Sequence, residues 1–272
     1  MTDHLTFVGT ATVILELGGL RFITDPVFDP PGQTHRVGRM GWGRAFRYTR
    51  LQGPALPVEQ VGPIDVVLLS HDHHADNLDS TGRSLLPGAK AIYTTVAGAR
   101  RLKRSGLAQA HGLSPGQRVE LPGPAGPVTL TAAPAQHGPA WISRMAGPVI
   151  GFFLEHLGRR LYLSGDTLWH SALAHFAETH VPEVALIHLG AATFGPTGPI
   201  RYSANLQDFG ELARAWPAAQ LVPIHFEGWS HFKQGPSGSL APLQEGPWSE
   251  RVRTLRPGQR ELLWRPDETQ ES

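Results

Sequence analysis

Short apolar runs, separated by turns rich in glycine and proline, recur along the whole chain. Residues 4–26 alternate β-branched and apolar positions around Gly18 and Gly19, which predicts short antiparallel strands. Residues 64–70, IDVVLLS, form a continuous apolar run that is too short for most helices. Such a run predicts a strand that is buried on both faces.

The later segments alternate between the period of a strand and that of a helix. Strands are expected over residues 127–139, 149–167 (a hairpin), 184–190, 220–229 and 258–264, and helices over 95–106, 168–180 and 203–216. Thr167 is expected to cap the helix over 168–180. Residues 29–63 show neither period clearly, so we expect a long surface loop there.

The expected strands and helices are interspersed along the chain, and no linker divides them. The sequence therefore predicts one mixed α/β domain over residues 1–264. The polar tail over 265–272 is expected to be disordered.

Polar side chains follow five of the expected strands at the point where each strand ends. They are Asp25, the run from His71 to Asp76, His137, Asp166 and His225. Because strand ends in layered α/β folds converge on one edge, these residues are expected to form one site.

The stretch LLSHDHHADNLD, residues 68–79, holds three imidazoles and three carboxylates. Such a cluster is costly to bury unless something binds it, and a metal ion is the usual partner. In an extended segment His71 and His73 face the same way, so both can reach one ion. The chain has 0 cysteines, so a metal would be held by histidine and carboxylate alone.

Five segments in order resemble the metallo-β-lactamase-fold hydrolases: LTFVGTATVILELGGLRFITDPVF, SHDHHADNLD, AAPAQHGP, LSGDT and VPIHFEGW. The resemblance runs from about residue 5 to about residue 232 and favours the branch of ascorbate-6-phosphate lactonases and N-acyl-phosphatidylethanolamine phospholipase D. It implies an αββα sandwich of two mixed β-sheets flanked by helices, with one or two Zn²⁺ or Mn²⁺ ions at the edge between the sheets.

The resemblance also implies a role for individual residues. Asp166 would bridge two ions, and the other ligands would be His71, His73 and His137 for the first ion and Asp76 and His225 for the second. Asp25 would support the ligand loop without binding metal.

The ligand loop departs from the family spacing H-x-H-x-D-H by one extra residue. With a gap, Asp76 keeps its role and Asn77 replaces a metal-binding histidine; without one, Asp76 takes that histidine position and Ala75 the aspartate position. Since an amide oxygen is a weaker ligand than imidazole for a borderline ion, the second site is expected to be weak, to recruit His74, or to suit a harder ion such as Mn²⁺.

The expected activity is hydrolysis of a phosphodiester, lactone or related ester by a metal-bound hydroxide. Asp76 would orient this hydroxide, and His74 or His231 would protonate the leaving group. His188 lies inside an apolar strand, so it is expected to be a hydrogen-bonded histidine near the core.

Residues 36–50 carry five arginines among aromatic side chains. Since arginine binds phosphate and carboxylate and stacks on aromatic rings, this segment is a candidate lid for an anionic small molecule, with phosphorylated substrates slightly favoured. The candidate substrate-binding residues are Arg36, Arg39, Trp42, Arg44 and Trp229. A solvated loop or a subunit contact in a homo-oligomer explains the segment equally well.

Two alternatives remain at this stage. A nuclease or another nucleic-acid processing enzyme is disfavoured by the formal net charge of +1, so no nucleic-acid partner is expected. The second alternative is a non-catalytic metal-binding protein, because Asn77 in place of a histidine would weaken the second metal site. No apolar run approaches the roughly 20 residues that a membrane span requires, and the N-terminus lacks the pattern of a signal peptide, which favours a cytoplasmic protein.

Overall fold

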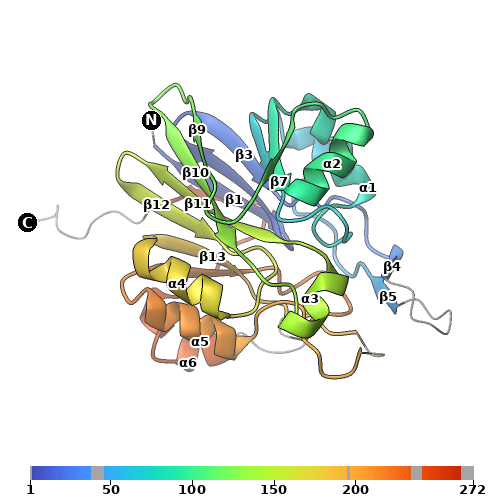
Figure 1. Cartoon of the computed structure of the whole chain (residues 1–272), viewed down its shortest axis with the longest axis vertical. Helices are drawn as coiled ribbons and strands as arrows, with labels where there is room; N and C mark the ends of the chain where they lie inside the picture. Colours follow the sequence, from blue (N-terminus) through green and yellow to red (C-terminus); the bar gives the residue numbers. More distant parts are fainter. Residues whose placement is uncertain (1, 38–45, 195–196, 234–240, 265–272) are drawn as a thin grey trace, which may run out of the picture.

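The computed structural model describes residues 2–37, 46–194, 197–233 and 241–264. Two sheets pack face to face, and helices cover their outer faces (Figure 1). The predicted αββα sandwich of the α/β class is therefore confirmed. Among the described residues, no helix is long and apolar enough to cross a membrane.

The first sheet has seven strands in the order β15-β1-β2-β3-β6-β7-β8. Their bounds are β15 (Arg260–Leu262), β1 (His4–Gly9), β2 (Thr12–Leu17), β3 (Leu20–Thr24), β6 (Val66–Leu68), β7 (Ala91–Thr95) and β8 (Ala110–Leu113). The predicted antiparallel turn between β2 and β3 is confirmed, and Gly18 and Gly19 both adopt positive φ there. The apolar run becomes β6, which lies between the parallel strands β3 and β7.

The second sheet has six strands in the order β14-β13-β12-β11-β10-β9. Their bounds are β14 (Gln220–Ile224), β13 (Val184–His188), β12 (Arg159–Leu163), β11 (Ile150–His156), β10 (Val128–Pro134) and β9 (Arg118–Leu121). Strands β12, β13 and β14 are parallel, and β11 is antiparallel to both β10 and β12. Strands β10, β12, β13 and β14 therefore end at the same edge.

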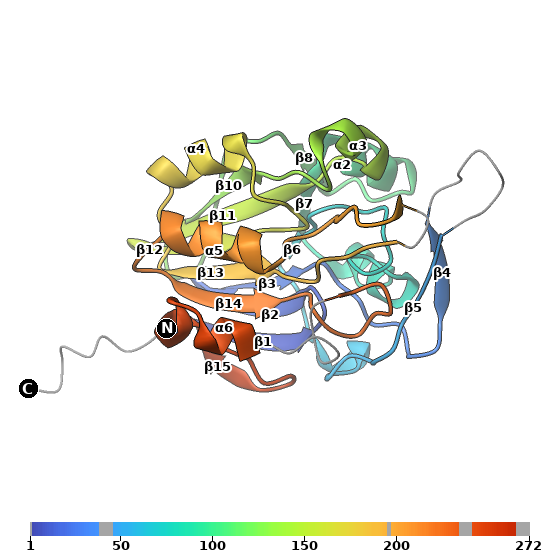
Figure 2. The same ribbon diagram turned by 90° about the horizontal axis from the view of Figure 1, so that it is seen from below.

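The main core fills the space between the two sheets with buried aliphatic and aromatic side chains. It includes Phe7, Leu15, Phe22, Leu68, Leu130, Phe152, Leu163, Leu186 and Val222. On the outer face of the first sheet lie α1 (Ser80–Arg83) and α2 (Val96–Arg104) (Figure 1). On the outer face of the second sheet lie α4 (Ser171–Thr179) and α5 (Leu206–Ala215) (Figure 2). The shorter helices are α3 (Ala140–Ala146), α6 (Ala241–Glu245), η1 (Val58–Gln60), η2 (Leu86–Gly88) and η4 (Ser249–Arg251).

Two local expectations are wrong. The segment expected to be a loop contains a hairpin of β4 (Thr34–Val37) and β5 (Phe46–Thr49), whose four-residue strands are too short to give a clear alternating pattern. Helix α4 begins at Ser171 and has His170 as its N-cap. Thr167 instead accepts a hydrogen bond from the backbone N–H of Gln136, which ties the end of β12 to the end of β10.

Candidate metal centre

Six strands deliver polar side chains to one edge of the sandwich. Asp25 follows β3, residues 71–79 follow β6, His137 follows β10, Asp166 follows β12 and His225 follows β14, while His188 is the last residue of β13. Apart from the exposed His73 and the partly exposed His74, the candidate ligands at these strand ends are buried. The edge thus collects imidazoles and carboxylates in a region shielded from water.

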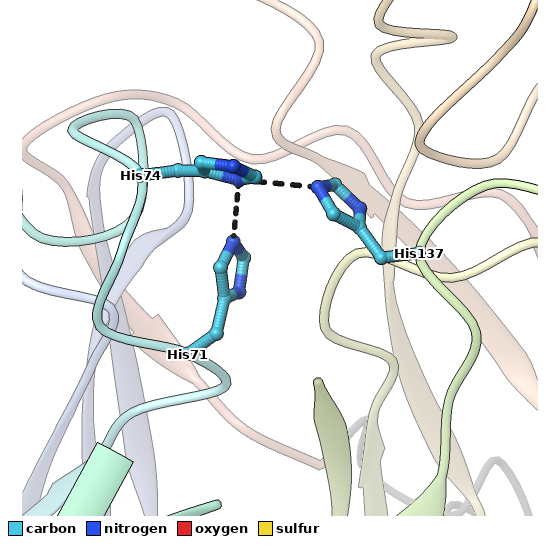
Figure 3. Close-up of side chains that lie close together, drawn as sticks. All are labelled: His71, His74 and His137. Carbon is cyan, nitrogen blue, oxygen red and sulfur yellow. Dashed lines mark hydrogen bonds between the residues drawn. The ribbon is translucent and has the colours of Figure 1, made fainter. Parts of the chain in front are cut away.

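The first group of candidate ligands is His71, His74 and His137 (Figure 3). Nδ1 of His74 lies 3.2 Å from Nε2 of His71 and 3.1 Å from Nε2 of His137. His137 uses its other nitrogen, Nδ1, to donate to the carbonyl of Tyr202 over 2.6 Å. That bond leaves the lone pair of Nε2 directed at the group.

His73 lies outside this group, although the expected H-x-H pair included it. Its Nε2 donates to the carbonyl oxygen of Ala146 over 2.7 Å. The loop is not extended here, because the chain bends at residues 72 and 73 before it turns after His74, where the backbone N–H groups of Asn77 and Leu78 both donate to the carbonyl of His74. With this bend, the side chain of His74, three positions after His71, lies at the place expected for His73.

The second group is Asp166, His188 and His225. Oδ1 of Asp166 lies 2.9 Å from Nδ1 of His188 and 3.2 Å from Nδ1 of His225. Within the described part of the chain, Oδ2 of Asp166 and both ring nitrogens of His225 are buried and have no hydrogen-bond partner. These unpaired atoms need a further partner, since buried polar groups are normally satisfied.

Asp76 lies beside the second group, between two imidazoles. Its Oδ2 is 3.0 Å from Nε2 of His231 and 3.6 Å from Nε2 of His225. Burial alone would raise the pKa of the Asp76 carboxyl, but the two histidines outweigh it and hold that pKa well below its usual range. Asp76 is therefore an anion in contact with both His225 and His231.

The other two carboxylates of the ligand loop hold it in place. Asp72 forms a two-pronged ion pair with the guanidinium of Arg101 in α2. Asp79 caps α1 by accepting from the backbone N–H of Gly82 over 2.7 Å, and it also accepts from the backbone N–H of Asp29 over 2.6 Å. These contacts anchor the loop at both ends, so its histidines are held in position.

Asp25 supports the same loop from the end of β3. Its Oδ1 accepts from the backbone N–H of Ser70 over 2.7 Å, and its Oδ2 accepts from the side-chain amide of Asn77 over 3.3 Å. Burial raises the pKa of Asp25 to about 7. Both Asp25 and His225 have positive φ, of 31° and 57°, so two of the strand ends at this edge carry backbone strain.

Burial and mutual repulsion keep the first group of imidazoles neutral. The pKa values of His71 and His74 lie well below the usual value, because each ring is desolvated and faces other imidazoles, and burial also lowers the pKa of His137. Burial would raise the pKa of Asp166, but His225 and His188 outweigh it and lower that pKa. Neutral imidazoles and an ionised carboxylate are the protonation states that metal binding requires.

The donor atoms fit a divalent cation. Ligand atoms bound to zinc at about 2.0–2.1 Å in a tetrahedral site lie about 3.3 Å apart. This is close to the 3.1 and 3.2 Å between Nδ1 of His74 and its two neighbours, and to the 2.9 and 3.2 Å between Oδ1 of Asp166 and its two neighbours. The donor set holds imidazole nitrogen and carboxylate oxygen without thiolate, which suits zinc, manganese or iron.

The expected substrate-binding residues are only partly described. Arg39, Trp42 and Arg44 lie outside the described residues. Trp229 is buried, with the guanidinium of Arg50 placed 5.2 Å from its ring centre. Arg36 is exposed, and because neighbouring strand residues alternate, it lies on the hairpin face opposite His35, which packs against Trp229.

A cleft of about 760 Å³ opens beside the first group of ligands. Its lining includes Gln136, His137, Ser143 and His170, together with the exposed Arg100 of α2. Sequence reasoning did not find this cleft, because its walls come from α2, β8, α3 and the end of β10. The sequence prediction also left His188 out of the site. The signal that could have found it is its position at the end of a strand, where the other candidate ligands also lie.

A family model described as the beta-lactamase superfamily domain matches residues 20–226. The chain is 23% identical over 233 residues to the UPF0173 protein YddR of Bacillus subtilis, covering 84% of this chain and 87% of that protein. It is 24% identical over 178 residues to a UPF0173 metal-dependent hydrolase of Thermoplasma volcanium, covering 65% and 72%. The solved structure of a possible metal-dependent hydrolase from Veillonella parvula superposes with a TM-score of 0.83 at 18% identity, over 97% of this chain and 100% of that one.

Proposed function

The chain belongs to the beta-lactamase superfamily, and on that basis we propose that it is a metal-dependent hydrolase of an ester-type bond in a small molecule. One observation carries the proposal: two groups of imidazole and carboxylate side chains, all buried except the partly exposed His74, have donor atoms within 4.8 Å of one another in each group. The names of the Thermoplasma and Veillonella relatives agree with this class of activity.

The residues that would hold a first cation are His71, His74 and His137, and those that would hold a second include Asp166 and His225. A divalent cation held there would polarise the carbonyl or phosphoryl oxygen under attack and would lower the pKa of bound water to about 7. The lowered pKa values of the first three imidazoles support their role, because neutral rings offer their lone pairs without first losing a proton.

His231 is the residue proposed to move a proton. Its Nε2 donates to Oδ2 of Asp76, and Tyr48 packs against its ring with 4.7 Å between centroids. The carboxylate fixes the orientation of the imidazole, and the aromatic neighbour shields it from water. A histidine held in this way can protonate a leaving group, which contributes about 10²–10⁴-fold to a rate.

The proposed substrate is an anionic phosphodiester, lactone or related ester, the chemistry of the branch that the sequence motifs resemble. It would enter through the cleft beside His137, where Arg100 is the one arginine or lysine among the described lining residues. Arg36 is exposed and faces away from the aromatic residues around His231, so its contribution would be long-range attraction of the anion.

Activity of metal-free and reloaded protein tests the proposal. The protein is stripped with a chelator, reloaded with zinc or manganese, and assayed with a nitrophenyl phosphodiester, a nitrophenyl ester and a lactone. We expect hydrolysis of at least one class, loss on stripping and recovery on reloading. The variant His74→Ala should lose one ion and most of the activity, whereas His73→Ala should retain both.

A metal-loaded protein that hydrolyses none of these substrates would favour a non-catalytic metal-binding protein instead. Loss of metal in His73→Ala but not in His74→Ala would overturn the assignment of the first group. His111→Ala, which alters an exposed histidine stacked on Tyr93, serves as the control for general effects of removing an imidazole.

A further inference from the structure

We propose that His188 is a ligand of the second cation and takes the place of the imidazole that the ligand loop lacks. This inference rests on the proposed function and deepens it. It concerns the last residue of β13, which was expected to be only a hydrogen-bonded histidine near the core.

The ligand loop has no imidazole to offer on the side of the second group. Asn77 occupies that part of the loop and is fully buried, and its amide nitrogen donates to Asp25 over 3.3 Å and to Oγ of Ser70 over 3.5 Å. The amide therefore supports Asp25 and the start of the loop. Another part of the fold must supply the missing nitrogen if the second cation is to have a complete set of ligands.

His188 is held in position to supply that nitrogen. Its backbone N–H donates to Oγ of Ser164 over 2.9 Å, which fixes the end of β13 against the end of β12. Its Nδ1 lies 2.9 Å from Oδ1 of Asp166, and its ring centre lies 4.8 Å from that of His225. Asp166, His188 and His225 thus each offer one donor atom from the ends of three adjacent parallel strands, and these atoms lie within 4.8 Å of one another.

A purely structural role for His188 leaves the surrounding charges and polar atoms unexplained. Asp76 and Asp166 are both buried, and among the described residues their ion-pairing partners are imidazoles, with no lysine or arginine among them. Buried carboxylates require a counter-ion. In addition, Oδ2 of Asp166 and Nδ1 of His225 have no hydrogen-bond partner in the described part of the chain. A cation at this point satisfies these atoms and the negative charge together.

Elemental analysis of purified, zinc-loaded protein tests the assignment without relying on activity. We expect two ions per chain in the parent and one in His188→Ala. The matched control is His156→Ala, since His156 is also a buried histidine at the end of a strand and its Nδ1 contacts only the carbonyl of Pro127 among the described residues. This control should keep both ions.

The variant His188→Cys gives a direct signature of ligation. The natural chain has 0 cysteines, so any thiolate-to-cobalt charge-transfer band in the cobalt-loaded variant must arise at position 188. The bond from zinc to a thiolate is about 2.3 Å long, whereas the bond to an imidazole is about 2.0–2.1 Å long. The longer bond compensates in part for the shorter reach of cysteine compared with histidine. We expect the band in this variant and not in the parent, with two cobalt ions bound.

The assignment is overturned if folded His188→Ala keeps two ions, or if His188→Cys binds two cobalt ions without the band. In either case the proposed function would still hold if the parent protein binds two ions and hydrolyses esters. A parent that binds no metal and hydrolyses nothing would contradict the proposed function and this inference together. Circular dichroism of each variant identifies a loss of metal that comes only from unfolding.

Discussion

The side-chain amide of Asn77 donates to Oδ2 of Asp25 over 3.3 Å, while Oδ1 of the same carboxylate accepts the backbone N–H of Ser70 over 2.7 Å. One carboxylate at the end of β3 therefore binds the ligand loop at two points, immediately before His71 and immediately after Asp76. The positions of His71, His74 and Asp76, which lie between these two points, depend on this contact.

Removing the Asp25 carboxylate should destabilise the metal-free protein. Asp25→Ala leaves the buried N–H of Ser70 without an acceptor, which costs about 1–3 kcal/mol. Asn77→Ala removes two longer bonds, to Oδ2 of Asp25 and to Oγ of Ser70, and should cost about 0.5–1.5 kcal/mol. Urea denaturation of both variants with the chelator present measures the two losses. Equal stability of Asp25→Ala and the parent would show that this contact does not hold the loop.

Asp25 should also give the metal-free protein a pH-dependent stability. Burial raises its pKa from 3.8 to about 7, so between these values the folded protein holds a proton that the unfolded chain has lost. The contribution of Asp25 to stability is present below pH 3.8 and decreases as the pH rises towards 7. Asp25→Asn cannot titrate, so the difference in unfolding free energy between parent and variant should change over this window. A constant difference would contradict the raised pKa.

Removal of metal should lower the melting temperature. A ligand present at 100 times its dissociation constant stabilises the folded state by about 2.7 kcal/mol. Each kcal/mol shifts the midpoint by about 2–4 °C in a protein of about 150–250 residues, so a decrease of several degrees is expected on chelation. Scanning calorimetry with and without chelator measures it. His137→Ala, which lacks a ligand of the first group, should respond less than the parent.

Two buried tyrosines should respond in opposite ways to loss of the hydroxyl. Tyr48 accepts the backbone N–H of Ala75 in the ligand loop over 2.9 Å, so Tyr48→Phe leaves that donor unpaired and should cost about 1–3 kcal/mol. The hydroxyl of Tyr162 has no partner among the described residues, so Tyr162→Phe should be neutral or stabilising. Denaturation midpoints of the pair test this contrast, and a similar cost for both changes would refute it.

Gly82 should tolerate no side chain. A Cβ at this position in α1 would lie 1.9 Å from the backbone oxygen of Pro26, directly after Asp25, so Gly82→Ala should cost about 1–3 kcal/mol or more. Gly88 is the control, since a Cβ there meets nothing within 4 Å. Gly88→Ala should be neutral or stabilise by up to about 1 kcal/mol. Thermal melts of the two variants separate these outcomes.

The alternating and continuous apolar runs predicted the strands of the two β-sheets well, because a strand in a sandwich must bury one or both of its faces. The run at 64–70 and the turn at Gly18 and Gly19 are examples. The hairpin of β4 and β5 escaped prediction because its strands are short and pack through His35 and Tyr48 against Trp229, a contact made across the fold.

The sequence by itself determined the kinds of ligand available, histidine and aspartate without cysteine, and their location at strand ends. Only the tertiary structure decided which nitrogens meet. His74 joins His71 and His137 because the chain bends at residues 72 and 73, so the two-residue period of an extended strand no longer applies. His188 meets Asp166 and His225 because parallel pairing aligns the ends of β12, β13 and β14. Distances between residues far apart in the chain depend on strand order and register, which the local pattern of a single sequence does not encode.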